Sequence, residues 1–204
     1  MTDNKFIKTM QKLKGPDNYF SDPYDQQSMY EDVATKSSLT PEEIAGIAGV
    51  ESEFGKYNQP LKGGSARGTF QLMPNTIKYL QERLSSQGSE KETNPLREEA
   101  RLTGELMKQH EQELGKTLGE DVEISPADVY VKHNLGAGMG KKLLKAKDKT
   151  PTQDILPENI IDANPSIYKD KNKAQTLKEI QNRLDKKSKE FKFENRGPLG
   201  FLEE

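Results

Sequence analysis

One acidic residue lies on the apolar face of the helix that the sequence predicts from Pro41 onward. Ile44, Ile47, Ala48 and Glu51 occur at positions i, i+3, i+4 and i+7, and residues at this spacing share one face of a helix. A charged carboxylate on a buried face is costly, so burial raises its pKa. A carboxyl group with a raised pKa can hold a proton near neutral pH and donate it as a general acid.

A structural interpretation of Glu51 stays open at this stage. A glutamate near the end of an amphipathic helix often reaches solvent or pairs with an arginine, and Arg67 or Arg101 could be that partner. Glu53 projects to another face of the same helix. The helix by itself therefore indicates either a catalytic acid or an ordinary ion pair.

A second patch follows a glycine-rich segment over residues 55–68. In Thr69-Phe70-Gln71-Leu72-Met73-Pro74, apolar residues alternate with groups that form hydrogen bonds. This pattern suits a polar, ring-shaped ligand such as a sugar, with Phe70 or Met73 as the apolar wall. A packed loop could show the same pattern.

A third patch places three hydrogen-bonding side chains on one helical face. Tyr130, His133 and Asn134 are spaced i, i+3, i+4. The glycines that follow, at 136, 138 and 140, predict a break or kink. A phosphate-binding loop is excluded here, because the segment lacks the required spacing, its Ser or Thr, and a preceding strand.

Helix-start signals indicate a mainly α-helical fold. Thr40, Asn94, Ser125 and Thr150 are each followed by proline, which predicts helices from about 41, 95, 126 and 151. Other helices are expected over 26–36, 74–85 and 173–191, with at most a small hairpin in 55–68. We expect an N-terminal extension over 1–23, one globular domain over 24–192 and a loosely held tail over 193–204.

Composition excludes several classes of function. The 204 residues include no Cys and only 2 His, which rules out disulfides, thiol nucleophiles and Cys/His zinc sites. We expect no cofactor and no metal. The net charge of -2 argues against a nucleic-acid binder, and no apolar run of about 20 residues is long enough to span a membrane. The first residues show no secretory signal peptide.

The patches, taken in order, resemble the soluble-type lytic transglycosylase domain of the lysozyme superfamily. Residues 47–54 look like its Glu-Ser catalytic motif, and residues 65–76 are similar to its Gly-Leu-Met-Gln-Leu-Met-Pro motif. Residues 94–104 look like the following core helix, and residues 133–136 resemble Tyr-Asn-x-Gly. The resemblance spans about residues 25–146 and implies a lysozyme-like fold with at most a small hairpin.

The resemblance also implies roles for individual residues. Glu51 would be the single acid/base of a peptidoglycan lytic transglycosylase, which cleaves the β-1,4 bond between N-acetylmuramic acid and N-acetylglucosamine. The expected substrate-binding residues are Ser52, Phe70, Gln71, Met73 and Asn134.

The sequence departs from the family pattern at two places. Thr69 and Phe70 replace the usual Leu-Met, and His133 replaces a tyrosine thought to orient the catalytic glutamate. Tyr130 or His133 could take over that role. We favour Tyr130, because a positively charged histidine would stabilise the Glu51 carboxylate and lower its pKa. His133 would then contact substrate or support the helix break.

A second resemblance concerns residues 162–168, which look like a segment of bacteriophage peptidoglycan-degrading enzymes, either virion-associated lysins or endolysins. It implies peptidoglycan strands as substrate and other virion proteins as partners. The protein would reside in the virion or the host cytoplasm before it reaches the cell wall. The alternatives are a goose-lysozyme-like hydrolase of the same fold and a non-catalytic wall-binding or structural virion protein.

Overall fold

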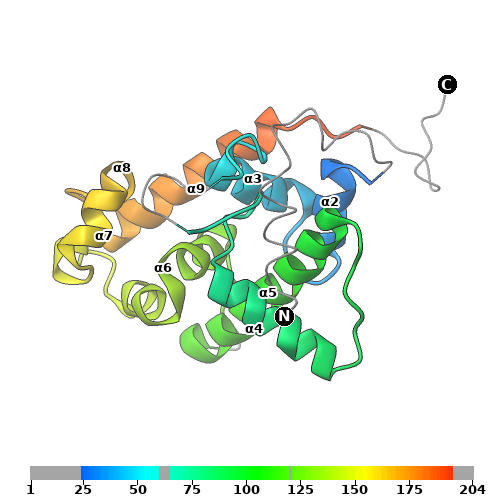
Figure 1. Ribbon diagram of the computed structural model, residues 1–204. Helices are drawn as coiled ribbons and strands as arrows, with labels where there is room; N and C mark the ends of the chain where they lie inside the picture. Colours follow the sequence, from blue (N-terminus) through cyan, green and yellow to red (C-terminus); the bar gives the residue numbers. More distant parts are fainter. Residues whose placement is uncertain (1–23, 60–64, 120, 195–204) are drawn as a thin grey trace.

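Helices supply most of the fold, as the sequence predicted. The computed structural model describes residues 24–59, 65–119 and 121–194 (Figure 1). Within these ranges the only β pairings are two isolated antiparallel bridges, Arg67 with Leu72 and Pro151 with Asn172. The first bridge closes the loop before α4 and is the only β pairing near the expected hairpin among the residues that the structure describes; residues 60–64 lie outside them.

Eight α-helices and one short 3-10 helix form the described part of the chain (Figure 1). In chain order they are α2 (Gln26–Ala34), α3 (Pro41–Ser52), α4 (Pro74–Ser86), α5 (Pro95–Leu118), α6 (Pro126–Lys145), η2 (Thr152–Asp154), α7 (Glu158–Ala163), α8 (Pro165–Tyr168) and α9 (Lys173–Glu190).

The cap signals in the sequence act as expected at three helix starts. Thr40 and Ser125 form capping boxes at α3 and α6, and the Asn94 side chain accepts hydrogen bonds from the first turn of α5. The prediction of an α-helix from about residue 151 is wrong. Only η2 forms there, since Pro157 and Pro165 divide the following segment into the short helices α7 and α8.

Helix α3 lies at the centre of the fold, packed between α9 and α2 (Figure 1). Its contact with α9 is close because Gly46 has no side chain: a Cβ atom there would lie 2.7 Å from the Leu184 carbonyl oxygen. Helix α5 packs on α2 and α6 and completes the core. Its buried position places α5 directly behind the loop that follows α3.

Of the expected domain boundaries, only the C-terminal one at residues 192–193 falls inside the described residues. The extension over 1–23 and residues 195–204 lie outside the described residues. Residues 193 and 194 still belong to the folded part, because the buried Gln27 side chain exchanges two hydrogen bonds with the Glu194 backbone. In the described ranges, no helix has the length and apolar character needed to cross a membrane.

Candidate active site

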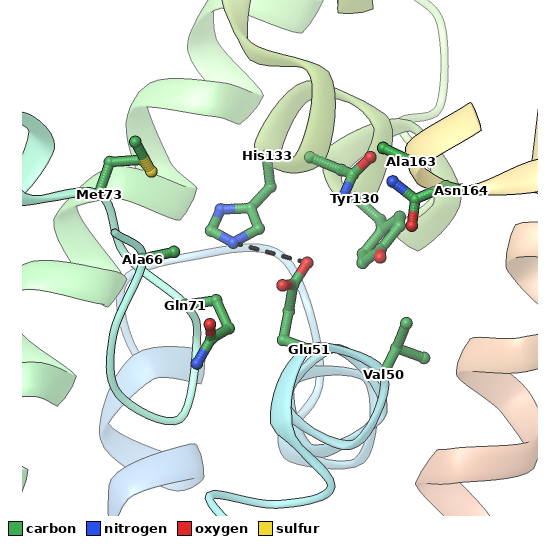
Figure 2. Close-up of a pocket in the computed structure, with 10 residues that line it drawn as sticks. Val50, Glu51, Ala66, Gln71, Met73, Tyr130, His133, Ala163 and Asn164 are labelled. Atoms are coloured by element: carbon green, nitrogen blue, oxygen red, sulfur yellow. Dashed lines mark ion pairs between the residues drawn. The ribbon is translucent and has the colours of Figure 1, made fainter. Parts of the chain in front are cut away.

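A cleft of about 390 Å³ opens between α3, the loop before α4, α6 and the end of α7 (Figure 2). Side chains from all three sequence patches meet in it, although Glu51 and Asn134 lie 83 positions apart in the chain. The lining residues are Val50, Glu51, Ala66, Gln71, Met73, Tyr130, His133, Asn134, Ala163 and Asn164. Among the described lining residues, Glu51 is the only carboxylic acid.

Glu51 occupies the last turn of α3, and its carboxyl group points into the cleft (Figure 2). Burial raises the pKa of this carboxyl group above its ordinary value. Its Oε1 atom is buried and has no hydrogen-bond partner. A carboxyl group in such surroundings favours the protonated form, which a general acid requires.

The alternative that Glu51 is half of an arginine ion pair does not hold. Arg101 instead forms a salt bridge of 2.8 Å with Glu98, on the far side of the core. The Nε atom of Arg67 is buried without a hydrogen-bond partner. Neither arginine neutralises Glu51 in the described structure.

Both candidate orienting residues face Glu51, and the preference for Tyr130 stays a prediction. The Tyr130 hydroxyl and the His133 ring both interact with the Glu51 carboxyl group, and His133 Nε2 lies 3.9 Å from Glu51 Oε1 (Figure 2). Both contacts lower the pKa of Glu51, against the larger effect of burial. Burial thus favours the protonated form of Glu51, whereas Tyr130 and His133 favour its charged form.

The ring of His133 is oriented by the loop backbone. Its Nε2 atom lies 2.9 Å from the carbonyl oxygen of Phe70. A carbonyl oxygen can only accept a hydrogen bond. His133 Nε2 therefore carries a hydrogen and donates a hydrogen bond to the Phe70 carbonyl oxygen. The 3.9 Å separation from Glu51 is too long for a second hydrogen bond, so the ring lies beside the carboxyl group without being bonded to it.

Gln71 and Asn134 line the cleft, as the sequence predicted, and each amide is held by the protein. Gln71 has a left-handed backbone (φ 48°), and its Nε2 donates to the carbonyl oxygens of Tyr57 and Gly68 at 3.1 and 2.9 Å. Its amide oxygen is left as an acceptor toward the cleft. Asn134 Oδ1 accepts a 2.8 Å hydrogen bond from the Tyr168 hydroxyl. Met73 is 51% exposed and remains available as an apolar wall.

Two predicted substrate-binding residues do not line the cleft, and these predictions are corrected. Ser52 is buried, and its hydroxyl donates to the Thr69 carbonyl oxygen at 2.7 Å while accepting from the Gly55 amide at 2.7 Å. The Phe70 side chain is fully buried, with its ring packed edge-on against Tyr30. Both residues shape the loop from behind because side chains in the core cannot contact a ligand.

Sequence patterns did not assign the cleft wall formed by α7 and α8. Ala163 and Asn164 line the cleft, and Tyr168 supports Asn134 from behind. No helix was predicted from Pro165, and no local pattern indicated which way this segment would face. Only the packing of α8 against α9 turns it toward α6.

Comparison with known proteins identifies one family. The family described as "Transglycosylase SLT domain" matches residues 28–156, more than half of the chain. The matched region contains every predicted site residue and ends before the wall formed by α7 and α8. No curated protein shows significant sequence similarity to the chain.

Proposed function

Because the chain belongs to the transglycosylase SLT domain family, we propose that it is a peptidoglycan lytic transglycosylase with Glu51 as its single acid/base. One observation carries the proposal: a carboxyl group whose pKa is raised by burial projects into a cleft whose described lining offers no second carboxylic acid. Two-carboxylate glycosidases need a second acidic group to activate water or to bond the sugar. Here the substrate would supply the second reacting group itself.

In the first step, protonated Glu51 donates its proton to the glycosidic oxygen between N-acetylmuramic acid and N-acetylglucosamine. The bond from the muramic anomeric carbon to that oxygen breaks, and the leaving sugar departs as an alcohol. The substrate's acetamido oxygen stabilises the positive charge at the anomeric carbon. Burial of Glu51 favours this step because it keeps the carboxyl group protonated.

In the second step, the Glu51 carboxylate accepts the proton of the muramic C6 hydroxyl. The C6 oxygen then bonds to the anomeric carbon and closes a 1,6-anhydro ring, which returns Glu51 to its acid form. The Tyr130 hydroxyl and the His133 ring support this step, because both favour the charged carboxylate. The opposing influences on the pKa thus match the two roles of one residue.

The test is mass spectrometry of soluble products released from purified sacculi. A lytic transglycosylase releases anhydro-muropeptides, which are lighter by one water than the products of a hydrolase. Reducing-end products would instead identify a goose-lysozyme-like hydrolase. Binding to sacculi without any release would identify a non-catalytic wall-binding or structural protein.

We also propose that a bacteriophage uses this activity to breach the bacterial cell wall, with the protein held in the virion or the host cytoplasm beforehand. The support is the resemblance of residues 162–168 to phage enzymes, a segment that includes Ala163 and Asn164 of the cleft wall. Proteomic analysis of purified virions tests it. Peptides of this chain in the particle indicate a virion component, and peptides found only in lysates of infected cells indicate an endolysin.

A further inference from the structure

Three helices converge on the backbone of Thr69 and Phe70, just behind the cleft, where they contact two successive peptide units. From α3, Ser52 donates to the Thr69 carbonyl oxygen at 2.7 Å. From α6, His133 donates to the Phe70 carbonyl oxygen at 2.9 Å. From α5, Glu99 accepts a hydrogen bond from the Phe70 amide at 3.1 Å. This short segment therefore links the helix of Glu51 to the ring that faces Glu51.

A glutamate at position 99 costs the fold free energy, because its carboxyl group is buried. Its side chain is buried in the core, and its Oε2 atom has no hydrogen-bond partner. No lysine or arginine in the described structure neutralises it, whereas its neighbour Glu98 has Arg101. Burial raises the pKa of Glu99 to about 7, although hydrogen bonds from Thr69 and Phe70 lower it in part. An apolar residue would avoid this cost.

Gly68 in this loop lies very close to the Glu99 carboxyl group. A Cβ atom on Gly68 would lie 2.5 Å from Glu99 Oε1, so only glycine permits this contact. Gly68 also has a φ of 81°, which glycine adopts without strain. The carboxyl group and the loop are thus fitted to each other directly beneath the cleft.

We propose that Glu99 is a positioning residue for the reaction of Glu51, which it influences by holding the backbone of Phe70, the residue whose carbonyl oxygen orients His133. This inference rests on the proposed function of Glu51. If the Phe70 amide lost its acceptor, the backbone of Phe70 could shift, and its carbonyl oxygen, which belongs to the next peptide unit, would leave His133 Nε2. The ring would then lose its fixed place 3.9 Å from Glu51 Oε1, and turnover would fall while substrate binding stayed nearly unchanged.

The experiment compares Glu99→Leu, Glu99→Gln and Glu99→Asp with the wild-type chain. Leucine removes the acceptor but suits a buried position, and aspartate withdraws the carboxyl group by one methylene. Glutamine keeps an acceptor oxygen within reach of the Phe70 amide. Tyr30→Phe is the control, because it changes a buried group of the same core, whose hydroxyl has no hydrogen-bond partner, and keeps the ring against Phe70.

Two readouts separate positioning from simple support of the fold. Release of muropeptides gives kcat and KM, and nitrogen-proton NMR of the imidazole rings reports the tautomer and hydrogen bond of His133. Only 2 histidines contribute signals, and His133→Gln assigns them. We expect Glu99→Leu and Glu99→Asp to lower kcat by about 10- to 100-fold with KM changed by less than about twofold. Both should alter the His133 signals, while Glu99→Gln and Tyr30→Phe stay close to wild type.

Normal kcat in Glu99→Leu, or lost kcat with unchanged His133 signals in both Glu99→Leu and Glu99→Asp, would overturn the proposal. If Glu99→Leu does not fold, Glu99→Asp decides by the same two readouts. If the wild-type chain releases no muropeptides, the proposed function fails, and the His133 spectra of the variants alone decide whether Glu99 positions the ring.

Discussion

His133 Nε2 lies 3.9 Å from Glu51 Oε1, yet its hydrogen bond goes to the Phe70 carbonyl oxygen at 2.9 Å. The imidazole ring is thus held beside the acid without being bonded to it. Tyr130 is the second group that acts on this carboxyl group, and both residues lower its pKa. This arrangement leads to the following predictions.

Glu51→Gln should lower the release of muropeptides by about 10²- to 10⁴-fold, because the amide is nearly isosteric but has no transferable proton. The circular dichroism spectrum should match that of wild type. Glu53→Gln is the matched control, since Glu53 is exposed and forms a 2.8 Å salt bridge with Lys187. It should change the free energy of unfolding by less than about 1 kcal/mol and leave activity intact. Substantial activity in Glu51→Gln would exclude Glu51 as the acid.

The cleavage rate should decline on the alkaline side of its pH profile. Burial raises the pKa of Glu51, so the protonated form persists above the ordinary glutamate range and is lost as pH rises through the shifted pKa. Initial rates on purified sacculi at constant ionic strength measure this profile. A rate that stays flat well into alkaline pH would contradict a carboxylic general acid.

Tyr130→Phe and His133→Gln should both lower kcat, by about tenfold or more, since each removes a group that stabilises the Glu51 carboxylate. The pKa of Glu51 should then rise further, and the alkaline limb should move to higher pH in both variants. Tyr79→Phe, at an exposed position on α4, is the control and should match wild type. An unmoved alkaline limb in both variants would show that neither residue acts on Glu51.

Gly68→Ala should destabilise the fold more than Gly88→Ala, although the two glycines have similar φ values of 81° and 79°. An alanine at either position costs about 1–2 kcal/mol for the left-handed backbone. At position 68 the new methyl group would also meet the Glu99 carboxyl group at 2.5 Å, whereas nothing lies within 4 Å at position 88. Urea unfolding should therefore give a loss larger by about 1–3 kcal/mol for Gly68→Ala. Equal losses would show that the contact with Glu99 is not tight.

Local patterns in the sequence were sufficient for the helical fold and for part of the site. Caps and prolines are short-range signals, so the starts of α3, α5 and α6 follow from a few neighbouring residues. The apolar spacing around Glu51 likewise indicated a buried carboxyl group. The kink at Gly136, where φ is 70°, was expected from the glycines that follow Asn134.

Tertiary packing decided which of the candidate side chains reach the cleft. Ser52 and Phe70 are adjacent to Glu51 and Gln71 in the chain, yet both turn into the core, because Ser52 bonds the loop backbone and Phe70 packs on Tyr30. Asn164 and Glu99 have no local signal for their roles. Their positions depend on contacts of α7, α8 and α5 with residues far away in the chain, and such contacts form only when the whole core assembles.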